Sequence, residues 1–211
     1  KFGIDPSQIT KKIDRKKIKV IKDFFPPRKN NLRNINVKFD LITSIAMFYD
    51  LDNPNLFVKN INNYLKSDGV WVFELSYLID MLKLNSFDTI CHEHFEYYSL
   101  SSLNYLMKNN GLKIFKVEKN KINGGSIRCF VTQDKNIMYD QKENIVYLNR
   151  LLKNEKKLKI KSTKIYKKFF LNILKIKIKL KKIIEKIKDK NKSIYVLGAS
   201  TKGNTILQYL D

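Results

Sequence analysis

The sequence of 211 residues contains little cysteine, little arginine and no long apolar run. Its two cysteines, Cys91 and Cys129, are too few for a disulfide scaffold or for a zinc site with four cysteine ligands. No apolar stretch approaches the roughly 20 residues that a helix needs to cross a bilayer. With 43% hydrophobic residues, the chain is expected to form a folded core in a reducing, cytoplasmic setting, without a membrane partner.

Basic residues exceed acidic ones by 22, which at first suggests a nucleic-acid partner. The excess is local, because residues 150–192 contain 18 of the 42 basic residues and 3 of the 20 acidic ones. Nearly all of these are lysines placed between isoleucines and leucines, whereas proteins that bind nucleic acid usually use arginine and interleaved aromatic residues. A solvated helical face is therefore favoured, and nucleic acid is not the expected partner. Polyanion binding and a membrane-surface helix remain as alternatives.

Apolar strand patterns alternate with helical patterns along the chain, which favours an open α/β sheet. Residues 39–48 and 70–75 are continuous apolar runs, as expected of strands that are covered on both faces. The remaining expected elements are a short strand at 19–25, a helix from Pro54 to Leu65 that stops at Lys66–Gly69, helices at 78–84 and 99–109, a closing strand pair at 112–120 and 124–133, and two connecting helices within 140–190.

The first and the last residues of the sequence both fall within predicted strand and helix patterns. The first residues, KFGIDPS, predict the end of an apolar strand followed by the start of a helix. Residues 194–199 predict a buried strand, and a turn and a helix are expected after it. Both ends are therefore expected to belong to units of a longer protein.

Both histidines of the chain lie in one string, DTICHEHFEYYS, at residues 88–99. A string that follows a strand–helix unit is expected at the edge of an open α/β sheet, where reacting groups usually lie. His94 is a candidate general base because its ordinary pKa is close to neutrality, and Glu93 or Glu96 is placed to orient it. A metal site and an inert polar loop are the alternatives, although a metal would need further ligands.

Three other segments are candidates for ligand binding. Asp5 follows the first strand, where a carboxylate can accept hydrogen bonds from ribose hydroxyls or can simply cap a helix. Residues 198–205, GASTKGNT, open a helix after a predicted strand, and their amides, hydroxyls and Lys202 suit a diphosphate. They also suit an ordinary tight turn. The segment Asn123–Ser126 is either a turn between strands or the lining of a site.

Five segments together carry a resemblance to a known family: FDLITSIAMFYDLDNPNLFVKNI, LKSDGVWVFELSYLIDML, FDTICHEHFEYYSL, NGGSIR and GASTKGNTILQ. The chain resembles the S-adenosylmethionine-dependent C-methyltransferases of deoxysugar biosynthesis over nearly its whole length. The family has a small N-terminal zinc-binding domain, a central class I methyltransferase domain and a C-terminal Rossmann-like domain that helps to hold the nucleotide-sugar. Cys91 stands where some sugar-methylating members have tyrosine, which leaves the sugar undefined.

The resemblance implies a domain plan for the chain. Residues 1–135 would form a partial, Rossmann-like methyltransferase domain, residues 136–192 a Lys-rich helical connector, and residues 193–211 the start of the C-terminal substrate-binding domain. The zinc-binding part and the glycine-rich cofactor loop do not lie within the sequence. We therefore expect the isolated chain to bind cofactor poorly and to be inactive by itself.

The resemblance also implies a reaction and a set of site residues. A base removes a proton beside the ketone of a nucleotide-linked keto-deoxysugar, and the resulting enolate takes the methyl group of S-adenosylmethionine. A nucleic-acid methyltransferase that uses the Lys-rich helices and an inactive scaffold are the alternatives. The implied residues are His94 as base and Glu93 as its partner, Asp5, Ser44, Ala46 and Met47 for the cofactor, and Tyr77, His92, Tyr97, Tyr98, Asn123, Ser200, Thr201 and Lys202 for the substrate, with no metal in this chain.

Overall fold

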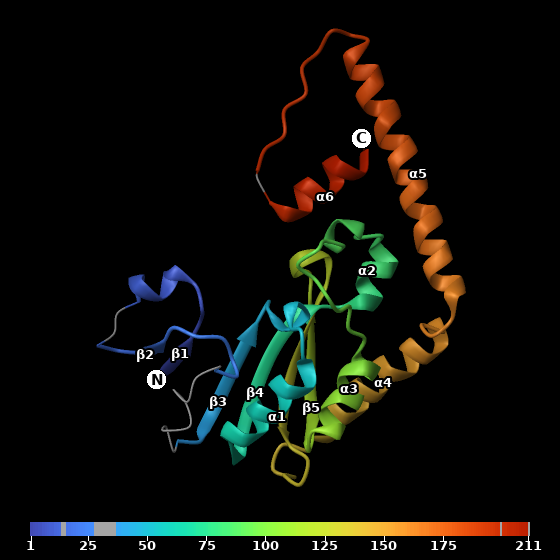
Figure 1. Cartoon of the computed structure of the whole chain (residues 1–211). Helices are drawn as coiled ribbons and strands as arrows, with labels where there is room; N and C mark the ends of the chain where they lie inside the picture. The colour runs from blue at the N-terminus through green and yellow to red at the C-terminus, as the bar shows by residue number, and fades with distance from the viewer. Residues whose placement is uncertain (14–15, 28–36, 199, 211) are drawn as a thin grey trace.

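The computed structural model of the protein describes residues 1–13, 16–27, 37–198 and 200–210 (Figure 1). Its strands are β1 (Phe2–Ile4), β2 (Lys19–Ile21), β3 (Phe39–Ile45), β4 (Leu65–Ser76), β5 (Leu112–Asn120) and β6 (Ser126–Gln133). Its α-helices are α1 (Pro54–Tyr64), α2 (Leu78–Leu84), α3 (Leu100–Asn109), α4 (Lys142–Leu158), α5 (Thr163–Lys188) and α6 (Thr201–Leu210). Four short 3₁₀ helices are η1 (Gln8–Lys12), η2 (Phe48–Asp50), η3 (Phe87–Thr89) and η4 (Ile122–Gly124).

The described strands form two sheets. The larger sheet has the order β3-β4-β6-β5, in which β3 and β4 are parallel and the other two pairings are antiparallel. The smaller sheet consists of β1 and β2, which are parallel. The α/β class and the predicted closing strand pair are confirmed.

The core lies on the face of the larger sheet that helices α1, α3 and α4 cover (Figure 1). Trp71 and Phe73 point from β4 into this core, where Phe48 stacks on Phe73 with ring centroids 5.3 Å apart. The side chain of Asn53 accepts a hydrogen bond from the amide of Leu56 and so begins α1, as an N-cap residue does. Helix α1 ends at Tyr64 and β4 starts at Leu65, so the predicted stop at 66–69 is wrong because those residues already belong to the strand.

The expectation that residues 39–48 are covered on both faces is also wrong. Ile42 and Ser44 of β3 face the core, whereas Leu41 and Ile45 are 59% and 52% exposed. Successive side chains of a strand point to opposite faces. Within the described residues, β3 pairs with β4 alone, and Leu41 and Ile45 line a cavity between β3 and the smaller sheet, so these positions remain open.

The predicted buried strand at 194–199 is not formed. Residues 194–198 form no regular secondary structure and pair with no strand of the described structure, and Tyr195 and Leu197 are almost fully exposed. Ala199 lies outside the described residues. An apolar run becomes a buried strand only where neighbouring strands bind its amide and carbonyl groups. The helix expected after this segment is present as α6.

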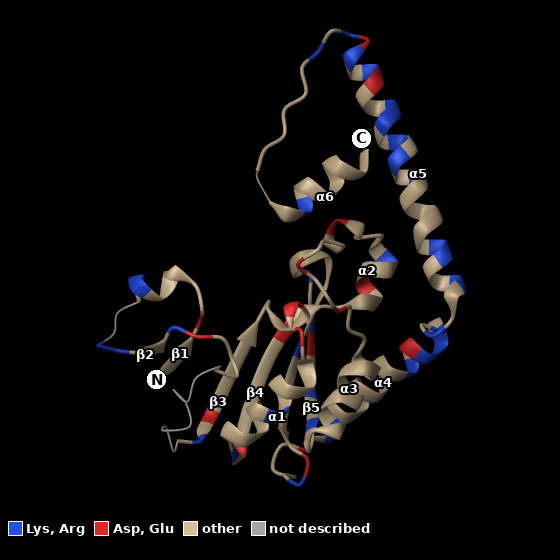
Figure 2. Ribbon diagram, in the orientation of Figure 1, with Lys and Arg blue, Asp and Glu red and all other residues tan. Residues whose placement is uncertain are grey.

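The two predicted connecting helices are present as α4 and α5, and α5 extends away from the sheet (Figure 1). Lysines are distributed along α5 (Figure 2), and its apolar stripe is buried only at Phe169 and Ile173. No described helix combines the length and the apolar character that crossing a bilayer requires.

Candidate active site

The carboxyl ends of β3 and β4 lie at the same edge of the sheet, and the string with both histidines contacts this edge through the amides of Phe95 and Glu96, which donate to the backbone oxygen of Tyr49. The Nδ1 atom of His94 lies 2.8 Å from the backbone oxygen of Thr89. A carbonyl oxygen only accepts hydrogen bonds, so Nδ1 carries the proton and the lone pair of the neutral imidazole is on Nε2. This bond therefore sets His94 in the tautomer of a base.

Tyr49, which follows β3 in η2, supports the histidine loop. The rings of Tyr49 and His94 are 4.3 Å apart between centroids. The backbone oxygen of Tyr49 accepts hydrogen bonds from the amides of Phe95 and Glu96, at 3.0 and 3.2 Å. Burial raises the pKa of the Tyr49 phenol, so this side chain is a neutral packing surface for His94.

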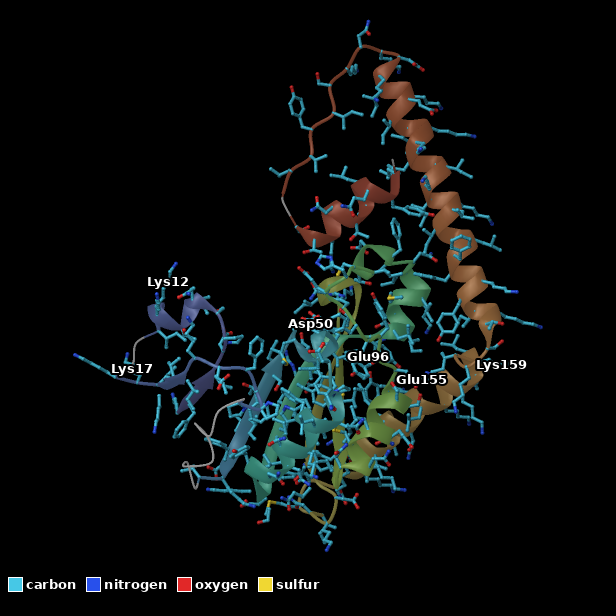
Figure 3. All side chains as sticks on the ribbon, viewed as in Figure 1. Lys12, Lys17, Asp50, Glu96, Glu155 and Lys159 are labelled. Carbon is cyan, nitrogen blue, oxygen red and sulfur yellow. The ribbon has the colours of Figure 1, made fainter. Side chains whose placement is uncertain are left out.

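Two acidic residues, Asp50 and Glu93, lie in the same part of the site as His94. Burial raises the pKa of Asp50, and the charge of Glu93 adds to this effect, whereas His94 lowers the pKa. Asp50 and Glu96 lie near the carboxyl ends of the strands (Figure 3). The charges of Asp50 and His94 therefore act on each other at this edge of the sheet.

Helix α6 brings two of the predicted substrate residues against this edge. The hydroxyl of Thr201 donates to Glu93 at 3.4 Å, and the Nζ atom of Lys202 donates to the side-chain oxygen of Asn123 at 3.4 Å. Ser200 accepts a hydrogen bond from the amide of Gly203 and thereby caps α6. The structure thus places one end of α6 beside both the histidine loop and η4.

The predicted tyrosines and His92 differ in their accessibility. Tyr97 is half-buried, and its hydroxyl donates to the backbone oxygen of Thr89 at 3.4 Å, beside His94. Tyr77 is 2% exposed and donates to Glu155, while Tyr98 is buried and its hydroxyl has no partner among the described residues. His92 is exposed. Tyr97 is therefore the tyrosine of this group that lies both close to His94 and partly open to solvent.

The predicted cofactor residues lie around a cavity of about 380 Å³ between the smaller sheet and β3, a size within the usual range for small-molecule sites. Ser44 and Met47 line it, and Asp5 follows Ile4, which also lines it. The hydroxyl and amide of Ser7 lower the pKa of Asp5, and one carboxylate oxygen accepts from that amide at 2.7 Å. Asp5 is therefore a charged carboxylate beside the lining of the cavity.

Ala46 follows β3 in the left-handed region, with φ of 54°. The hydroxyl of Ser44 accepts from Trp71 Nε1 at 3.2 Å and keeps its own proton for donation. The lining of the cavity is largely apolar, with a few polar side chains such as Thr43, Ser44 and Tyr64, which fits a nucleoside cofactor. In the described part of the chain, no three His, Cys, Asp or Glu side chains come together as a metal site.

Three contributors to this edge were missed by sequence reasoning. Thr89 acts through its backbone oxygen, which leaves no trace in the sequence. Tyr49 lies in a segment that was expected to border the cofactor, but its contact with His94 spans 45 positions. Glu155 could have been found, because it is an acidic residue within a Lys-rich helix and falls on the stripe of Leu148 and Leu151.

Taken together, the sheet, the cavity beside β3 and the polar loop at the carboxyl edge define a Rossmann-like α/β enzyme domain. Residues 2–117 match the family described as "Methyltransferase domain", and residues 121–211 match the "C-methyltransferase C-terminal domain". The chain therefore belongs to the methyltransferase-domain family, and its second part is similar to the C-terminal domain of C-methyltransferases. The predicted methyltransferase family is confirmed, and its deoxysugar substrate stays a prediction.

One curated protein and two solved structures are similar to this chain. The C-methyltransferase NovU of Streptomyces niveus is 29% identical over 150 residues, which cover 71% of this chain and 35% of that protein. The chain thus spans about a third of the length of this relative. Two solved structures, one entitled "A Pericyclic Reaction enzyme" and the other a LepI variant in complex with SAH and a substrate analogue, share the fold at 8% identity and a TM-score of 0.50. Each alignment covers 63% of this chain and 36% of the chain in the solved structure.

Proposed function

We propose that the whole protein is a C-methyltransferase that transfers a methyl group from S-adenosylmethionine to the carbon beside the ketone of a nucleotide-linked keto-deoxysugar. The observation that carries this proposal is the bond between His94 Nδ1 and the Thr89 oxygen, because it leaves Nε2 free to take a proton. The family and the name of the relative NovU support carbon as the acceptor atom.

His94 Nε2 would remove the proton from the carbon, and the electron pair of that C–H bond would form the enolate. Glu93 and Asp50 would stabilise the imidazolium that results, since both act electrostatically on this part of the site. Tyr97, whose hydroxyl lies beside His94, would assist at the keto oxygen. Positioning accounts for the rest of the catalysis, because the enolate carbon must approach the methyl group in line.

Asp5 and the Ser44–Met47 turn would hold the cofactor, with Asp5 at the ribose and the turn beside the adenine and methionine parts. When bound, S-adenosylmethionine supplies a methyl group on a sulfonium, whose positive charge is lost as the methyl leaves. The chain's own contribution is to bind, to align and to exclude water from the cavity beside β3.

Thr201, Lys202 and Asn123 would bind the diphosphate of the nucleotide-sugar. In the structure Lys202 contacts Asn123 and Thr201 contacts Glu93, so the end of α6 lies over the loop that carries His94. A cation and a hydroxyl at the first turn of a helix suit phosphate oxygens. A nucleotide-linked substrate could therefore be bound at α6 while its sugar reaches His94.

The test is an acceptor assay with the whole protein and methyl-labelled S-adenosylmethionine. A nucleotide-linked 4-keto-deoxysugar is expected to gain one carbon-bound methyl group, detected by mass spectrometry and NMR. The same sugar without its nucleotide, and a duplex RNA, serve as matched acceptors. Methylation of the RNA alone, or a methyl group on oxygen, would contradict the proposal.

A further inference from the structure

Glu155 of α4 is a buried acidic residue that takes part in none of the ion pairs of the described structure. It is 1% exposed, although α4 and α5 otherwise carry mostly lysines on their surfaces. Its carboxylate instead accepts three hydrogen bonds. Oε1 accepts from the Tyr77 hydroxyl at 2.7 Å and from the Leu100 amide at 2.6 Å, and Oε2 accepts from the Ser101 amide at 2.9 Å.

These donors explain how a carboxylate is accommodated in the core. The amides of Leu100 and Ser101 belong to the first turn of α3, where backbone N–H groups have no partner within the helix. The same turn carries the positive end of the helix dipole, which favours a negative charge. Ser99 already accepts from the amide of Ser102, so Glu155 satisfies the amides that this cap leaves over.

The contacts of Glu155 close a ring of hydrogen bonds below the histidine loop. The amide of Leu78 donates to the backbone oxygen of Tyr98 at 3.0 Å. Glu155 accepts hydrogen bonds from the hydroxyl of Tyr77, which precedes Leu78, and from the amide of Leu100, which lies two residues after Tyr98. A single side chain of the helical connector therefore fixes the end of β4 and the downstream end of the loop that carries His94.

We infer that Glu155 is a positioning residue, which fixes the His94 loop from the connector helix without contacting substrate or cofactor. The other anchors of the loop lie nearer to His94, because the Thr89 oxygen bonds His94 and Tyr97 and the Tyr49 oxygen accepts from the amides of Phe95 and Glu96. The catalytic consequence rests on the proposed function of His94, whereas the structural part does not.

The test compares Glu155→Gln with Glu143→Gln, which makes the same change at an exposed position of the same helix. Glutamine replaces one carboxylate oxygen of Glu155 with an NH₂ group, which can only donate. At least one of the three present donors then faces another donor, so one hydrogen bond is lost and the two donors oppose each other. Hydrogen–deuterium exchange of residues 94–101 is expected to become at least about tenfold faster, while β5 and β6 stay within about twofold. Glu143→Gln is expected to match the wild type.

Activity provides the second readout, in the whole protein with the nucleotide-linked keto-sugar. Glu155→Gln is expected to lower kcat about tenfold and to leave KM within about twofold, as expected when a base is misplaced. If the exchange is unchanged, or rises equally throughout the protein, the inference is overturned. It is also overturned if the loop loosens and kcat does not change.

A variant that removes only one hydrogen bond of Glu155 keeps the test possible if Glu155→Gln does not fold. Tyr77→Phe leaves both amide contacts of Glu155 in place, and we expect exchange of residues 94–101 to rise severalfold. Unchanged exchange in this variant overturns the ring that we describe. If the wild-type protein transfers no methyl group at all, the proposed function fails, and the exchange measurements still decide the role of Glu155.

Discussion

Gly125 is the residue of the NGGS segment whose substitution has the most predictable cost. It has φ of 112° and ψ of 114°, a combination that residues with a side chain rarely adopt. A Cβ atom at this position would lie 2.4 Å from the Cβ atom of Asp80. That atom is fixed to the backbone of α2 and cannot rotate away.

Two costs follow for Gly125→Ala. The backbone conformation contributes about 1–3 kcal/mol, and overpacking against Asp80 contributes about 1–3 kcal/mol. We therefore expect the free energy of unfolding to fall by about 2–6 kcal/mol. Urea unfolding followed by the fluorescence of Trp71 measures this, because Trp71 is the single tryptophan and is fully buried.

A double-mutant cycle with Asp80→Gly separates the two costs. Asp80→Gly removes the Cβ atom that the new alanine would meet, at the expense of the ion pair of Asp80 with Lys119. The combined loss should be smaller than the sum of the single losses by about 1–3 kcal/mol. Strict additivity, or a Gly125→Ala protein within about 0.5 kcal/mol of the wild type, would refute the reasoning.

Three further predictions concern other parts of the chain. Burial raises the pKa of the Cys129 thiol, so a thiol reagent at pH 8 should modify Cys91 alone in the folded protein. In denaturant it should modify both cysteines, and rapid modification of both in the folded protein would contradict the prediction. The hydrogen bonds with Ser7 lower the pKa of Asp5. They therefore contribute to the free energy of unfolding above the ordinary pKa near 3.9, and this contribution is lost as pH falls through the lowered value. NMR titration of Ser7→Ala should show the Asp5 pKa rising, and an unchanged value would exclude the contact. Phe48→Ala should cost about 3–5 kcal/mol by urea unfolding, because the ring is buried against four other aromatic rings, and a cost below about 1 kcal/mol would be inconsistent with that packing.

The order of elements could be predicted because local signals agree with the fold. Asn53 and Ser99 cap α1 and α3, and the apolar run at 70–75 becomes the central strand of the larger sheet. Such capping and periodicity act within a few residues of the chain. The domain plan that the family resemblance implied, with boundaries at 135 and 192, stays a prediction.

The wrong predictions concern burial, which depends on the strands and helices that pack against a segment. Residues 39–48 and 194–199 have the apolar character of buried strands, but that character does not specify how many strands and helices lie against them. Leu41 and Leu197 are exposed in consequence. Periodicity therefore identified the type of β3 correctly and its burial incorrectly.

The site was predictable only in part. The string at 88–99 led directly to His94 and Glu93, whose catalytic roles remain predictions. The contact of Thr201 with Glu93 joins residues 108 positions apart, and the bond of His94 uses a backbone atom. Neither leaves a local pattern, so the geometry around His94 required the structure.

The central claim, that His94 removes the proton beside the ketone, is tested most directly by deuterium exchange at the substrate carbon. The whole protein is incubated in D₂O with the nucleotide-linked keto-sugar and S-adenosylhomocysteine in place of the methyl donor. His94→Asn keeps an amide donor toward Thr89 and lacks Nε2, so exchange should fall at least about hundredfold from the wild-type rate. Equal rates of exchange and of methylation in the wild type and in His94→Asn would contradict the account.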